Sequence, residues 1–171
     1  MRKSQFLVRL QTERDQWERA LNYAGAARLG IGGVSSHWSA RDIAAFIMVR
    51  EQHLADRLHE IQMGESLPPC RSQEELDTFL EEFGYPDFES PILNQSNANE
   101  WAAQKYRNTP FQELVVIELH AYEAILEDLK LLSEEQIEAR RLYERITRAV
   151  IAHYRQYAAD IRKRFKSPIK R

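Results

Sequence analysis

WSARDIAAFIMVREQHLADRL, residues 38–58, is the stretch that decides the fold of this chain. Ser39 is a good N-cap and Asp42 follows three residues later, so the pair resembles a capping box with a shorter acid and predicts a helix start. The apolar residues that follow recur with the 3.6-residue period and share one face: Ile43, Ile47, Leu54, Leu58 and Ile61. The sequence therefore predicts a long amphipathic helix that closes at Gly64.

Three more long helices are predicted on the same grounds. Residues 4–29 carry apolar positions at helical spacing and end in three glycines at positions 30, 32 and 33. Thr109, followed by Pro110, caps a helix that runs to about residue 132. The last long helix covers about residues 142–165, after a capping box formed by Ser133 and Gln136.

The segment between the second and third long helices is rich in loops. Ser72 opens a short helix there, and NANEWAAQKYRN, residues 97–108, predicts a second one. No segment predicts a strand. We therefore expect an all-α four-helix bundle, a single domain over residues 1–165, with a helical and loop insertion and a basic C-terminal tail at 166–171.

Composition narrows the class of protein. The chain has 171 residues and is 43% hydrophobic, enough for one domain with its own core. No run approaches the roughly 18 apolar residues of a membrane span, and the N-terminus lacks the apolar region of a signal peptide. Cys70 is the only cysteine, which fits a reducing compartment. We expect a cytoplasmic protein without a membrane partner.

The charge is unevenly distributed. The net charge is -2, yet the last ten residues, RKRFKSPIKR, carry six positive charges and no negative one. Such a tail could touch nucleic acid or an acidic partner. The favoured interpretation is a solvated helix end, where lysine and arginine suit the helix dipole, so nucleic acid is not expected as a partner.

Three segments together resemble the DinB-like four-helix bundle proteins, and specifically their ClbS/DfsB branch. They are LQTERDQWERAL at residues 10–21, HWSARDIAAFIMVREQHLADRL at 37–58 and ITRAVIAHYRQYAADIR at 146–162. The resemblance covers nearly the whole chain. It implies a bundle that opens at one end into a pocket. Relatives include thiol-dependent transferases, presumed hydrolases and a self-resistance protein that hydrolyses a strained cyclopropane in a genotoxin.

Many DinB-like proteins hold a divalent metal with three histidines, and this chain departs from that pattern. Phe46 matches the histidine of the second long helix, while His153 and Tyr157 match the two of the last one. Phenylalanine cannot bind a metal, and a phenol would need a large drop from its usual pKa of about 10. The implied metal site is therefore degenerate, and we expect neither a bound metal nor a cofactor.

Arg50, His153 and Tyr157 are the candidate catalytic residues. His153 and Tyr157 lie on the apolar face of the last helix, and Arg50 falls within the apolar arc of the second. If Arg50 stays inside, the three converge on a polar or anionic ligand, with His153 titrating near neutral pH. The alternatives are two core residues with satisfied polar tips, and an arginine that reaches the surface or pairs with Asp160 or Glu118.

Phe46, His53 and Trp101 are candidate residues of the ligand pocket. His53 lies about 10 Å along the helix from Phe46, too far to replace the lost ligand. A surface or interface position is favoured for His53 and His120, which with Glu118 are the fallback ligands should a metal be found. Trp101 either covers the pocket mouth or joins a satellite cluster with neighbouring aromatics: Tyr85, Phe88 and Tyr106.

Two functions remain open from the sequence. The first is binding, with or without hydrolysis, of a small, partly polar or reactive metabolite. The second is a catalytically inactive bundle that serves as a partner-binding or structural module. LVVIEL at residues 114–119 is apolar on more than one face, so a homodimer or the insertion is expected to cover it.

Overall fold

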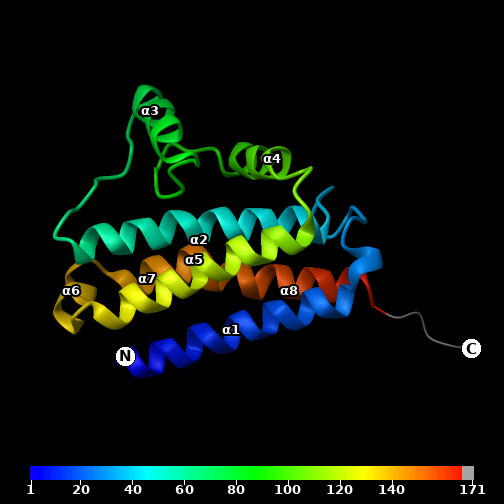
Figure 1. Ribbon diagram of the computed structural model, residues 1–171, viewed down its shortest axis with the longest axis horizontal. Helices are drawn as coiled ribbons and strands as arrows, with labels where there is room; N and C mark the ends of the chain where they lie inside the picture. The colour runs from blue at the N-terminus through cyan, green and yellow to red at the C-terminus, as the bar shows by residue number, and fades with distance from the viewer. Residues whose placement is uncertain (167–171) are drawn as a thin grey trace, which may run out of the picture.

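The chain is an all-α bundle in the computed structural model, which describes residues 1–166 (Figure 1). The predicted basic tail therefore lies outside the described residues except for Lys166. The elements are α1 (Lys3–Ala24), the 3-10 turn η1 (Ala26–Arg28), α2 (Ala40–Gln62), α3 (Gln73–Phe83), α4 (Gln95–Lys105), α5 (Phe111–Leu131), α6 (Glu134–Ala139), α7 (Leu142–Ile146), the π-helical turn η2 (Thr147–Ile151) and α8 (Ala152–Arg164).

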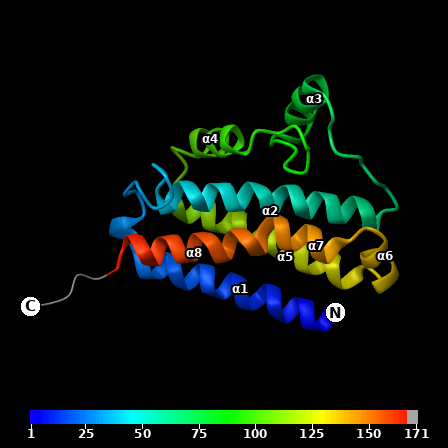
Figure 2. The ribbon, with the colours of Figure 1, turned by 180° about the vertical axis from the view of Figure 1, so that it is seen from behind.

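The four long rods of the bundle are α1, α2, α5 and the continuous α7–η2–α8 stretch. Arg41 at the start of α2 donates to the Tyr106 carbonyl just before α5, and His59 near the end of α2 lies 3.4 Å from Asp128 near the end of α5. These contacts make α2 and α5 parallel. Because the connection between them must return along the bundle, the insertion crosses the outside of α2 (Figures 1 and 2).

Local sequence signals set most of the helix ends. Ser39 and Asp42 form the expected capping box, as do Ser133 and Gln136. One expectation was wrong: α1 ends at Ala24 because Gly25 adopts a φ of 75°, a conformation that suits glycine, well before the predicted end at Gly30. The third long helix begins at Phe111 with Pro110 as its N-cap, one residue later than the Thr109 cap predicts.

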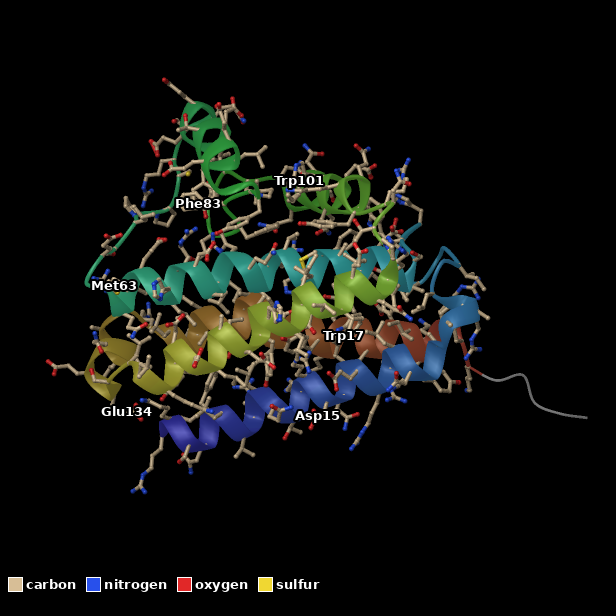
Figure 3. All side chains as sticks on the ribbon, in the orientation of Figure 1. Asp15, Trp17, Met63, Phe83, Trp101 and Glu134 are labelled. Carbon is tan, nitrogen blue, oxygen red and sulfur yellow. The ribbon has the colours of Figure 1, made fainter. Side chains whose placement is uncertain are left out.

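The insertion has a small core of its own. Cys70, Leu76, Phe79 and Tyr85 are buried together, with Phe83 and Trp101 packed against them. Figure 3 shows Phe83 on α3 and Trp101 on α4 on the side of α2 that faces away from Trp17 of α1. Trp101 thus joins a satellite cluster with Tyr85, as one interpretation predicted, whereas Phe88 and Tyr106 pack against the main core instead.

The apolar surface of α5 is only partly covered. Val115, Val116 and Leu119 are 44%, 53% and 41% exposed, and His120 is exposed beside them. The insertion packs along α2 and leaves this strip open. The homodimer stays a prediction. No helix in residues 1–166 has both the length and the apolar character that a membrane crossing requires.

Candidate functional site

A pocket of about 840 Å³ lies between α2, the loops of the insertion and the α7–η2–α8 stretch. A volume of this size suits a small organic molecule. Arg50, His53 and Arg57 line it from α2, at spacings of three and four residues that place them on one helical face. His153 and Tyr157 line it from α8, and Asp87 and Phe88 from the insertion.

Arg50 is buried in the pocket wall, with 4% of its surface exposed. Its Nη1 donates to the Phe46 carbonyl at 3.3 Å and its Nη2 to the Gln95 side chain at 3.0 Å, while the guanidinium lies 4.6 Å from the Phe88 ring centroid. Within residues 1–166 it forms no ion pair. Burial lowers the pKa of Arg50 to about 10, so it stays charged at pH 7.

The alternatives for Arg50 were wrong. It does not reach the surface, and neither predicted carboxylate pairs with it. Glu118 instead binds Arg14 of α1, on the other side of α2, because the face of α5 that carries Glu118 is turned toward α1. The Asp160 carboxyl interacts with Lys163 and forms no ion pair with Arg50.

His153 and Tyr157 stand next to each other on α8, with ring centroids 5.8 Å apart, in the same pocket as Arg50. Burial, and then the charge of Arg50, lower the pKa of His153 to about 4. His153 is therefore neutral at pH 7, and the expected titration near neutrality was wrong. Burial raises the pKa of Tyr157, so its phenol keeps its proton and can donate.

The turn before α8 widens into the pocket. Residues 147–151 form a π-helical turn, and its Arg148 and Ala149 line the cavity. Nδ1 of His153, one turn further on, is buried and makes no hydrogen bond of good geometry among the described residues, although the backbone of Ala149 and Arg148 interacts with the ring and partly offsets the fall in its pKa. Single π-helical turns inside α-helices are frequent at functional sites because they displace the backbone locally.

His53 and Asp87 form a buried pair that ties the insertion to α2. Nε2 of His53 lies 2.9 Å from Oδ1 of Asp87, and both side chains are under 5% exposed. The Cys70 backbone N–H donates to Oδ2 of the same carboxylate at 2.8 Å. Burial opposes ionisation of Asp87, but these hydrogen bonds and the His53 interaction outweigh it and hold its pKa at about 2. The carboxylate is therefore ionised at neutral pH.

Arg57 occupies the other side of His53. Its Nε donates to Glu60 at 2.6 Å, and its guanidinium lies 5.1 Å and 4.6 Å from the ring centroids of Phe79 and Phe83. Both terminal nitrogens, Nη1 and Nη2, are buried without a hydrogen-bond partner among the described residues. Two nitrogens of a charged guanidinium thus lack hydrogen bonds in a residue that lines the pocket.

Two predicted pocket residues lie elsewhere. Phe46 is fully buried in the bundle core and packs edge-on against Trp38 at 5.0 Å, because its side chain points into the bundle rather than toward the insertion. Trp101 lines a smaller hollow between α3 and α4. The residues that match the metal-binding histidines do not fit a metal: Phe46 offers no donor, and residues 1–166 contain no cluster of three or more His, Cys, Asp or Glu side chains arranged as ligands.

The sequence named Arg50, His53, His153 and Tyr157 as candidates, and the pocket brings all four together. The surface or interface position favoured for His53 was wrong, because the insertion covers its side chain and supplies Asp87 as its partner. The sequence missed the roles of Asp87 and Arg57. Arg57 carried a signal, since it follows Arg50 by seven residues on the same face, whereas Asp87 sits in a turn-rich loop with no periodic pattern. No family model, curated protein or solved structure matches the chain.

Proposed function

We propose that this chain is a ClbS/DfsB-like cytoplasmic protein that binds a small, partly polar molecule in the pocket between α2, α8 and the insertion. The observation that carries the proposal is Arg50. A buried guanidinium without a carboxylate is costly, and proteins keep such a group where a ligand supplies the missing partner. An open pocket of about 840 Å³ also weighs against the alternative of an inactive bundle with a solid core.

Hydrolysis of the bound molecule is the second part of the proposal, and the placement of a neutral His153 beside Arg50 and Tyr157 in one pocket favours it. A neutral imidazole can take a proton from a water molecule. Arg50 and the Tyr157 phenol can donate hydrogen bonds to an oxygen that gains negative charge. A polar ligand group that neutralises Arg50 would also relieve its effect on His153 and raise the pKa of that base. No step in this chemistry needs a metal.

The binding proposal is tested with Arg50→Met, which keeps a long side chain and removes the charge. A fragment library is screened by ligand-observed NMR against the wild type, and each hit is titrated into the variant. We expect hits that compete with one another for one site and lose affinity by about tenfold or more in Arg50→Met. Arg19→Met removes the same charge from the exposed face of α1 and serves as the control. Hits that bind Arg50→Met and wild type alike would refute the proposal.

The hydrolysis proposal is tested separately with His153→Gln. The wild type and the variant are incubated with a panel of strained or activated electrophiles, such as cyclopropyl ketones and esters, and product is followed by mass spectrometry. We expect turnover in the wild type and a loss of about a hundredfold or more in His153→Gln, the range of one general base. Equal turnover in the two proteins would remove His153 from the mechanism, while the binding proposal would stand on the fragment titrations.

A further inference from the structure

We infer that the pocket takes an organic anion, whose phosphate or carboxylate group is bound by the two free nitrogens of Arg57. This inference rests on the proposed function, since it names the class of ligand for the same pocket. It adds a second subsite, on the far side of His53 from Arg50.

The first argument is the geometry of Arg57. Nε is engaged by Glu60, and the guanidinium is held between Glu60 and the rings of Phe79 and Phe83, whose centroids lie 5.1 Å and 4.6 Å from it. Nη1 and Nη2 remain as a parallel pair of donors, buried and unpaired, in a residue that is 5% exposed. Two parallel N–H donors match the two oxygens of a carboxylate or phosphate, which is the recognition that arginine performs better than lysine.

The second argument is the charge of the whole pocket. Its wall carries only two carboxylates, Asp87 and Glu89, against five arginines: Arg50, Arg57, Arg140, Arg145 and Arg148. Arg145 is neutralised by Glu89 through two hydrogen bonds of 2.7 Å, and Arg57 forms an ion pair with Glu60. Arg50, Arg140 and Arg148 form no ion pair within residues 1–166. A positive pocket thus lies in a chain whose net charge is -2. Clefts lined by one sign of charge concentrate ligands of the opposite sign.

The two subsites are distinct places in the pocket. The His53 ring lies 5.7 Å from Phe88, on which Arg50 stacks, and 5.8 Å from Phe79, on which Arg57 stacks. Arg50 and Arg57 are seven residues apart on α2, about 10 Å along its axis. The anionic group of a ligand therefore binds at Arg57, and the polar part that meets Arg50, His153 and Tyr157 extends past His53.

The experiment titrates inorganic phosphate, and in a second arm acetate, into the full-length wild type at constant ionic strength. Binding is read by two-dimensional NMR of the backbone and of the arginine Nε–H groups. We expect saturable shifts at residues 53–60 and 79–88. Tighter binding of phosphate assigns a phosphate group to the ligand, and tighter binding of acetate assigns a carboxylate.

Three variants decide where the anion binds. Arg57→Met keeps the packing on Phe79 and Phe83 and is expected to lose phosphate or acetate affinity by about tenfold or more. Arg57→Lys keeps the charge but lacks the paired donors, so its affinity for phosphate or acetate should lie between those of wild type and Arg57→Met. This conservative variant also keeps the test decisive if Arg57→Met fails to fold. Arg19→Met, the exposed control, should stay within about twofold of the wild type.

Each other outcome overturns the inference. Wild type that binds neither phosphate nor acetate excludes an anion site, while the fragment titrations with Arg50→Met still decide the proposed function. Anion binding that survives Arg57→Met but is lost in Arg50→Met moves the anion to the Arg50 end. That result keeps the proposed function and refutes the Arg57 subsite.

Discussion

His153→Gln is expected to make the stability of this protein less sensitive to acid. The folded protein holds the pKa of His153 at about 4, against 6.5 for an ordinary histidine, because the ring is buried beside Arg50. Since the folded-state pKa is the lower one, the stability linked to this group is fully present above pH 6.5. It is lost as the pH falls toward 4, because the unfolded chain takes up a proton that the folded chain refuses. Glutamine has a similar size and does not titrate.

The size of the effect follows from the two pKa values. One pKa unit corresponds to about 1.36 kcal/mol, so the linked loss reaches about 1.4 kcal/mol at pH 5.5 and about 2.5 kcal/mol at pH 4.5. These figures are upper values, since the His153 side chain is partly exposed and solvent screens it. The free energy of unfolding of wild type minus that of His153→Gln should therefore fall steadily between pH 7 and pH 4.5.

Urea unfolding at pH 7.5, 6.5, 5.5 and 4.5, followed by circular dichroism, measures this difference directly. Other groups that titrate between pH 4.5 and 7.5 are common to both proteins and cancel. His120→Gln, at an exposed position on α5, shows what the loss of a histidine does by itself. A difference that stays constant from pH 7.5 to 4.5 would refute a buried, neutral His153 beside a charged Arg50.

Three further predictions concern other parts of the chain. Burial, and then the neighbouring Glu118, raise the pKa of the fully buried Glu51 well above its usual value, so stability linked to it is lost as the pH rises through that folded-state pKa. The stability of Glu51→Gln relative to wild type should therefore increase as the pH rises. Urea unfolding at pH 5 and pH 8 measures this difference, and an equal difference at the two pH values would contradict the prediction. Untagged protein should contain well under one zinc, nickel or iron per chain by elemental analysis, because Phe46 offers no donor atom and the raised pKa of Tyr157 keeps its phenol protonated; one ion per chain would overturn this. The homodimer prediction is tested by sedimentation, where Val116→Asp should dissociate the dimer without unfolding it, and a wild-type monomer of 20.1 kDa would reject the dimer.

The helices of the bundle could be predicted from the sequence because their signals are local. Caps such as Ser39 with Asp42 and the 3.6-residue apolar period act within a few residues of the chain, and the structure has helices where they indicated. The same period placed Arg50, His153 and Tyr157 on inner faces. Their meeting in one pocket followed once the two helices were packed against each other.

Local signals also have limits within a helix. Gly25 ends α1 five residues before the cluster of glycines does, since a single glycine with φ of 75° is enough and nothing in the pattern distinguishes it beforehand. The π-helical turn at residues 147–151 leaves no mark in the apolar period.

The wall of the pocket that the insertion forms against α2 depends on tertiary structure alone. His53 and Asp87 are 34 residues apart, and their pairing depends on how the insertion folds back over α2. The free donors of Arg57 depend equally on Phe79 and Phe83 reaching it from α3. Contacts between distant segments are set by the packing of whole surfaces, which hydrophobic periodicity along one helix does not encode. The sequence by itself determined the bundle and the inward residues of its helices, and the long-range packing of the insertion turned them into a positively charged pocket.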